Sequence, residues 1–115
     1  MKVEQVYQCL GPVFSAEADP STEKGMIVTF RNGVLEPVDP VETITVGIVL
    51  DIMSNGLAVV LSNRQLVRIS SLEGATVGDY LSTVGGHLQV ADRRYDWNVA
   101  QVVQIDGDMM TIRIL

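Results

Sequence analysis

The chain has 115 residues, 47% of them apolar, and a net charge of -6 from 14 acidic and 8 basic residues. This length and apolar fraction fit one globular domain with its own core, and they exclude an intrinsically disordered chain. The basic residues are scattered, whereas a protein that follows a phosphate backbone gathers them, so nucleic acid is not an expected partner.

Residues 1–24 differ in composition from the rest of the chain. Five of their side chains suit a short strand: Val3, Val6, Tyr7, Cys9 and Leu10. Gly11-Pro12 interrupts this strand, and residues 16–24 are small, polar and acidic. We therefore predict an extended N-terminal arm that orders on a partner and adds little to the stability of the domain. Two alternatives stay open, a frayed terminus and a strand that belongs to the β domain itself.

The β domain is predicted to cover residues 25–115, and its first half consists of short strands. The expected strands are residues 26–30, 34–38, 43–53 and 57–61. Asn32-Gly33 separates the first two, and Asn-Gly between apolar strands is a strong hairpin signal because both turn residues must accept a positive φ. Asn55-Gly56 separates the last two in the same way.

The second half continues this pattern. Further strands are expected at residues 65–69, 98–105 and 109–115, with hairpin turns at Gly85-Gly86 and Asp106-Gly107. No stretch after residue 25 has a convincing helical period of 3.6 residues. The sequence therefore predicts an all-β (mainly β) fold, a small barrel or sandwich-like domain preceded by the arm.

The chain repeats itself at an offset of 53 residues. Residues 25–35 lie over residues 78–88, and residues 46–52 lie over residues 99–105. A slip of one or two residues then brings Asn55-Gly56 over Asp106-Gly107. We place the two pseudo-repeats at about residues 25–61 and 78–115. Structural turns are expected at six glycines: Gly25, Gly33, Gly56, Gly78, Gly86 and Gly107.

Motifs for catalysis, cofactors and metals are missing from the sequence. There is no Gly-rich phosphate loop with a lysine and no dinucleotide fingerprint, so no cofactor is expected. One cysteine and one histidine are too few for a zinc site, and Cys9 is interpreted as a buried structural thiol. His87 stands beside a predicted turn, where a solvated imidazole is the plain interpretation. We expect no enzymatic activity, no secretory leader and no membrane span.

The loop before residue 98 differs most between the two copies. It contains residues of the types that are enriched in protein interfaces: Arg93, Arg94, Tyr95 and Trp97. These four, together with Val3, Val6 and Tyr7 of the arm, are the candidate protein-interface residues. For Trp97, a plug in the core or at the end of the barrel is the alternative interpretation.

With this repeat in view, the chain resembles the small capsid decoration, or cement, proteins of tailed bacteriophages. The resemblance covers residues 25–115 and depends on the order of glycines, hairpins and apolar strands in each copy. Gly25, Gly33 and Val46-Gly47-Ile48-Val49 carry it in the first copy. In the second copy the matching positions are Gly78-Asp79, Gly86 and residues 99–103, with Ala100 in place of Gly47.

The resemblance implies a structural virion protein that binds the outside of an expanded capsid and stabilises it. Its partners would be the major capsid protein and further copies of itself, most typically in a homotrimer. It would stay in the host cytoplasm until assembly places it on the capsid exterior. The alternatives are a small β-barrel module of a phage tail, fibre or baseplate and, from another class, a cellular ligand-binding barrel.

Overall fold

The computed structural model describes residues 6–10, 12–38, 45–62, 64–91 and 98–115, the first of these segments for its backbone alone. Every regular element in these segments is a strand, which confirms the predicted all-β class. The strands run in chain order as β1 (Val6–Leu10), β2 (Val13–Glu17), β3 (Ile27–Arg31), β4 (Val34–Pro37), β5 (Gly47–Ile52), β6 (Leu57–Ser62), β7 (Leu66–Ser70), β8 (Tyr80–Val84), β9 (His87–Val90), β10 (Ala100–Asp106) and β11 (Met109–Ile114).

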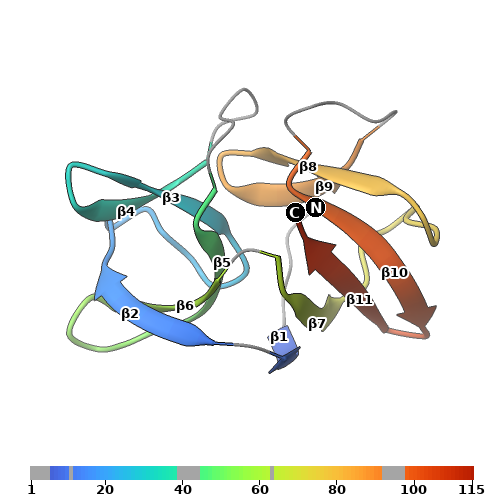
Figure 1. Cartoon of the computed structure of the whole chain (residues 1–115), viewed down its shortest axis with the longest axis horizontal. Coiled ribbons are helices and arrows are strands. Elements are labelled where there is room, and N and C mark those ends of the chain that lie inside the picture. The colour runs from blue at the N-terminus through green and yellow to red at the C-terminus, as the bar shows by residue number, and fades with distance from the viewer. Residues whose placement is uncertain (1–5, 11, 39–44, 63, 92–97) are drawn as a thin grey trace.

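The strands form two antiparallel sheets that lie next to each other, with β2 to β6 on one side (Figure 1). The five-stranded sheet has the order β2-β6-β5-β3-β4. The six-stranded sheet has the order β1-β7-β11-β10-β8-β9. When β1 is left out, the two sheets have the same strand order, with β7 to β11 in the places of β2 to β6. The fold is thus a small sandwich of two repeats with one extra strand.

The duplication extends to details of the backbone. The β-bulge between Val49 and Asp51 recurs between Val102 and Gln104, 53 residues later. The Gly25 N–H donates to the Val49 carbonyl at 2.8 Å, and the Gly78 N–H donates to the Val102 carbonyl at 2.9 Å. The structure extends the correspondence to β2 and β7, which occupy the same place in the two sheets. We call residues 13–62 the first repeat and residues 66–114 the second.

The first hairpin of each repeat turns in the same way. Asn32 and Gly33 have φ of 55° and 80°, and Gly85 and Gly86 have φ of 56° and 84°. Two successive positive φ angles match the twist of the flanking strands, which is why Asn-Gly and Gly-Gly occur there. The other four glycines expected at turns, Gly25, Gly56, Gly78 and Gly107, also have positive φ.

Two parts of the N-terminal segment, residues 6–10 and 13–17, are strands, one in each sheet. β1 runs antiparallel to β7, with Gln8 opposite Arg68 and Leu10 opposite Leu66. β2 runs antiparallel to β6 along its whole length. Residues 6–10 and 13–17 thus form strands of the two sheets, and the expectation that the arm adds little to the stability of the domain stays a prediction. Here the alternative of strands within the β domain holds, because edge strands complete ladders that other strands leave open.

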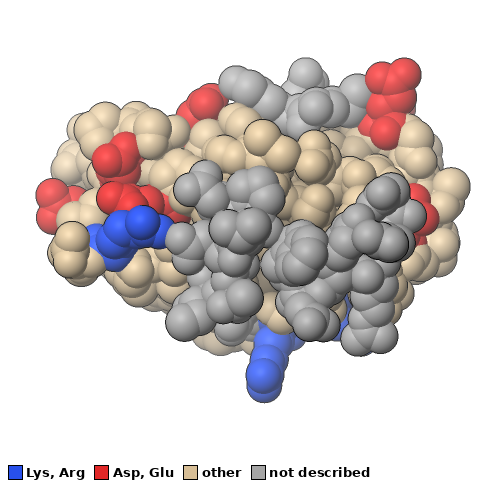
Figure 2. Space-filling view, turned by 90° about the horizontal axis from the view of Figure 1, so that it is seen from above, with Lys and Arg blue, Asp and Glu red and all other residues tan. Residues whose placement is uncertain are grey.

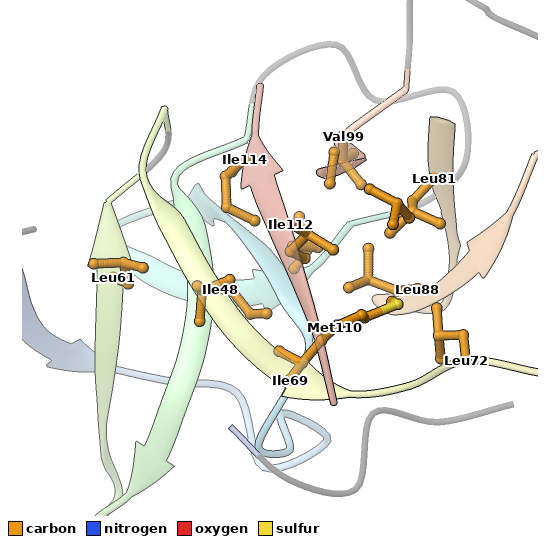
Figure 3. Close-up of a cluster of buried hydrophobic side chains, with 14 of the residues drawn as sticks. Ile48, Leu61, Ile69, Leu72, Leu81, Leu88, Val99, Met110, Ile112 and Ile114 are labelled. Carbon is orange, nitrogen blue, oxygen red and sulfur yellow. The ribbon is translucent and has the colours of Figure 1, made fainter. Parts of the chain in front are cut away.

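Two apolar cores correspond to the two repeats. The smaller fills the first repeat and consists of Met26, Val28, Leu35, Val49, Ala58 and Val60. The larger fills the second repeat and also takes in Ile27, Val38, Ile48 and Leu61 from the first (Figure 3). The first repeat therefore presents an apolar outer face that packs against the second.

The corresponding outer face of the second repeat is polar. The positions equivalent to Ile27, Ile48 and Leu61 carry Tyr80, Gln101 and Arg113. Tyr80 and Gln101 are partly exposed and Arg113 is exposed, whereas the three apolar residues are fully buried. This difference explains why the first repeat buries its outer face against the second, while the outer face of the second repeat stays open.

A turn of the second repeat fastens this contact. The Ile27 N–H donates to the Gly86 carbonyl at 2.8 Å, and the Gly86 N–H donates to the Val38 carbonyl at 2.9 Å. The Thr83 hydroxyl donates to the same Val38 carbonyl at 3.2 Å. The β8–β9 turn is thus inserted between the ends of β3 and β4.

Candidate protein-binding site at the edge of the first repeat

Most of the interface residues predicted from sequence lie outside the described residues. These are Val3, Arg93, Arg94, Tyr95 and Trp97. Val6 and Tyr7 belong to β1, where the structure describes the backbone that pairs with β7 and not the side chains. The structure therefore brings together no group of side chains from this set, and its role as an interface stays a prediction.

A different surface emerges at β2. Within the described residues, this strand pairs with β6 on one side and meets β4 on the other only at its far end. There Ala18 forms a parallel bridge with Leu35, and the Asp19 N–H donates to the Leu35 carbonyl at 2.8 Å. From Val13 to Ser15 the side of β2 away from β6 has no described strand beside it.

Two aromatic rings lie next to this stretch. The rings of Phe14 on β2 and Phe30 on β3 stack with centroids 6.1 Å apart and planes inclined by 29°. Phe30 is 47% exposed and Val13 is 50% exposed, whereas Phe14 is partly buried against the core of the first repeat. Apolar side chains that remain exposed beside an unpaired strand edge are typical of a surface that binds another polypeptide. We call Val13–Ser15 together with the Phe30 ring the β2 edge.

Comparison of the repeats singles out the same rings. The positions equivalent to Phe14 and Phe30 carry Val67 and Thr83, which are both buried. Phe14 and Phe30 are the only two phenylalanines of the chain, and both are in the first repeat. Neither ring stands out in the sequence, because the repeat that the sequence shows begins after β2 and leaves Phe14 without an aligned partner.

The charges around the β2 edge are mainly acidic. Glu17 and the Asp19 carboxylate lie at the end of β2, and both the hydroxyl and the backbone N–H of Ser21 donate to the Asp19 carboxylate, at 2.6 Å and 2.9 Å. These two hydrogen bonds lower the pKa of Asp19 below its ordinary value. Arg31 pairs with Glu36 at 3.1 Å on the neighbouring hairpin, so the charge of this arginine is compensated.

Elsewhere on the described surface the charges are dispersed. On the face shown in Figure 2, the acidic side chains stand at several separate places and the basic ones do not merge into one patch. His87 lies 3.8 Å from Glu23, a contact that is ionic only when the imidazole is protonated. The described residues contain no group of three or more His, Cys, Asp and Glu side chains that could hold a metal ion. Among these residues no helix is long and apolar enough to cross a membrane.

Comparisons with known proteins do not assign a family. No model of a known protein family, no curated protein and no solved structure matches the chain.

Proposed function

We propose that the protein is a structural virion protein that binds the outer surface of a phage capsid and stabilises it. The observation that carries the proposal is the β2 edge, an unpaired strand with exposed apolar and aromatic side chains on a duplicated β scaffold. Such an edge suits binding to another polypeptide. The sequence resemblance to decoration proteins suggests that this other polypeptide is a capsid protein.

The charge supports the same proposal. A decoration protein waits in the cytoplasm at high copy number before the shell is ready, and a net charge of -6 favours solubility through mutual repulsion. It then binds at many equivalent places, where a modest interface for each copy suffices because the effect on the whole shell multiplies. The expected partners are the major capsid protein and further copies of this chain in a homotrimer.

Fractionation of virions tests the proposal. Virions of the phage that encodes the chain are sheared, and heads and tails are separated and analysed by mass spectrometry. The protein should be found with the heads. Purified protein should also cosediment with expanded heads that lack it, and it should raise the temperature at which they release their DNA. Its recovery with tails alone would contradict the proposal and favour a tail, fibre or baseplate module.

The oligomeric state is a separate measurement. Analytical ultracentrifugation of the free protein and reconstruction of decorated heads would show whether three copies associate. A monomer in both settings would remove the trimer from the proposal without affecting its other parts.

A further inference from the structure

The second repeat shows what the edge corresponding to the β2 edge can bind. β7 occupies the same place in its sheet as β2 does, and β7 carries β1 on the side away from β11. Arg68 stands opposite Gln8, and Leu66 stands opposite Leu10, in an antiparallel pair. Since the repeats differ by 53 residues here, the positions on β2 that match Arg68 and Leu66 are Ser15 and Val13.

The backbone groups of these two β2 residues point away from β6. The Ser62 N–H donates to the Pro12 carbonyl at 3.3 Å, which makes Pro12 a residue whose backbone faces β6. Backbone groups in an antiparallel ladder point alternately to one side and the other. The backbone N–H and carbonyl of Phe14 therefore also point towards β6, while those of Val13 and Ser15 point outwards. The same alternation holds on β7, where the Ile114 N–H donates to the Gln65 carbonyl at 2.9 Å. The backbone groups of Leu66 and Arg68 pair with β1, and the matching backbone groups of Val13 and Ser15 thus point away from β6 to the open side of β2.

The first repeat differs from the second in a way that suits an added strand. β4 covers the outer side of β2 from Ala18 onwards and leaves Val13 and Ser15 uncovered by any described strand. Phe14 and Phe30 replace the smaller Val67 and Thr83, and the Phe30 ring remains half exposed. A strand laid along β2 would place its inward-facing side chains near these rings and shield them from water.

We propose that the β2 edge accepts one antiparallel strand from a partner protein, paired with Val13 and Ser15 as β1 is paired with Leu66 and Arg68. The strand would present apolar side chains towards Phe14 and Phe30. That the partner is the shell protein rests on the proposed function. The carboxylates of Glu17 and Asp19 at the end of β2 favour a basic partner strand over the equally acidic β2 edge of a second copy. Copies in a homotrimer would then meet at another surface.

Amide hydrogen exchange followed by NMR tests the edge directly. In the free protein the Val13 and Ser15 amides should exchange fast, whereas the Arg68 amide, turned towards β1, should be protected. The probe is a synthetic peptide of residues 4–10 carrying Cys9→Ser, which contains the β1 residues that pair with β7. At millimolar concentration it should slow exchange at Val13 and Ser15 by about tenfold or more.

Each outcome of this experiment decides the matter. Slower exchange at Val13 and Ser15, with no change at Phe14, supports the proposal. Unchanged exchange of both amides at millimolar peptide overturns it. Protection of Ser15 in the free monomer also overturns it, because the chain would then cover its own edge. Protection that appears together with a dimer in ultracentrifugation would make the occupant a second copy and likewise overturn the proposal.

Two variants separate the edge from the fold. Ser15→Pro removes the outward N–H and leaves the ladder with β6 intact, so peptide binding should fall by about tenfold or more. Phe30→Ser removes the half-exposed ring and serves where the proline variant does not fold. Its matched control is Val84→Ser, which changes a side chain that is 52% exposed at the hairpin of the other repeat. Phe30→Ser should weaken peptide binding, and Val84→Ser should not.

The same variants distinguish this inference from the proposed function. If the wild-type protein binds heads and folded Ser15→Pro binds them equally well, the strand-addition inference is wrong and the proposed function stands. If the wild-type protein does not bind heads at all, the proposed function fails, and the peptide experiment still decides whether the β2 edge accepts a strand.

Discussion

Gly33 and Gly86 occupy the same turn in the two repeats, with φ of 80° and 84°, but only Gly86 is buried. A Cβ built on Gly33 would meet nothing within 4 Å. A Cβ on Gly86 would lie 2.8 Å from the Pro37 Cβ and 3.3 Å from the Ile27 carbonyl oxygen. One local conformation therefore serves as a free turn in the first repeat and as part of the joint in the second.

This pair gives a prediction with its own control. Gly33→Ala should reduce the free energy of unfolding by about 1 kcal/mol, because the left-handed backbone is strained with a Cβ. Gly86→Ala adds a collision with Pro37 and should cost about 2–5 kcal/mol. Urea denaturation of both variants measures the difference. Equal losses would mean that the β8–β9 turn is not packed against the first repeat.

The first residue of β5 offers a second matched pair. A Cβ on Gly47 would collide with the backbone carbonyl oxygen of Leu61, whereas Ala100, its counterpart, is fully buried with a Cβ in place. Gly47→Ala should therefore destabilise the protein by more than about 3 kcal/mol. Ala100→Gly should cost only about 1 kcal/mol. Thermal unfolding checks both, and a tolerated Gly47→Ala would show that β5 and β6 are more widely spaced.

The polarity of the two outer faces predicts an asymmetric response to exchange. Leu61 is fully buried between the repeats, and Arg113 holds the equivalent position in the open. Leu61→Arg would bury a charge without a partner and should cost more than about 4 kcal/mol or prevent folding. The reverse change, Arg113→Leu, should alter stability by less than about 0.5 kcal/mol. Comparable effects in urea denaturation would contradict the packing direction described above.

The sequence predicted those parts of the fold that depend on local chemistry. The hairpins at Asn32-Gly33 and Gly85-Gly86 follow from the need for positive φ, and the strands between them follow from β-branched and apolar residues. The correspondence of β2 with β7 is not visible in the sequence, since Val13–Glu17 and Leu66–Ser70 share an alternating pattern but have no identical residue at matching positions. Only their place in the sheets makes them equivalent.

The β2 edge could not be predicted for a related reason. Whether Phe30 is covered depends on which strand lies beside β2, and this is a contact between segments that are distant in sequence. An apolar ring in a strand is most simply expected in the core. The polarity switch from Ile27, Ile48 and Leu61 to their counterparts is visible in the sequence, but its meaning requires the one-residue slip before β6 to be known.

The turn after β2 gives a prediction about pH. Both hydrogen bonds from Ser21 lower the pKa of Asp19, and Ser21→Ala removes the hydroxyl donor, so the pKa should rise towards its ordinary value of 3.8. A depressed carboxyl pKa stabilises the fold above the pKa of the unfolded chain, and this contribution is lost as the pH falls through the folded value. The variant should therefore be less stable than the wild-type protein at neutral pH, and the two stabilities should converge in acid.

An NMR titration of the Asp19 carboxyl carbon measures this shift. Ser21→Thr is the matched control, because threonine keeps the hydroxyl donor and should leave the low pKa in place. A pKa that is the same in Ser21→Ala and Ser21→Thr would mean that the hydroxyl does not hold the carboxylate.

The last prediction concerns β1, which alone among the described strands has no counterpart in the first repeat. Removal of residues 1–10 would leave the outer edge of β7 without its ladder from Leu66 to Ile69. Each lost backbone hydrogen bond is worth about 1 kcal/mol, so the Tm should fall by on the order of 10 °C. Removal of residues 1–5 alone keeps β1 and is the control. The truncated protein should regain thermal stability when the peptide of residues 4–10 with Cys9→Ser is added, because the peptide can pair with β7 in place of β1. A truncation that melts with the full-length chain would show that β1 adds nothing to the domain. In that case β7 would be a second open edge, and the pairing of β1 with β7 would no longer support the addition of a strand at β2.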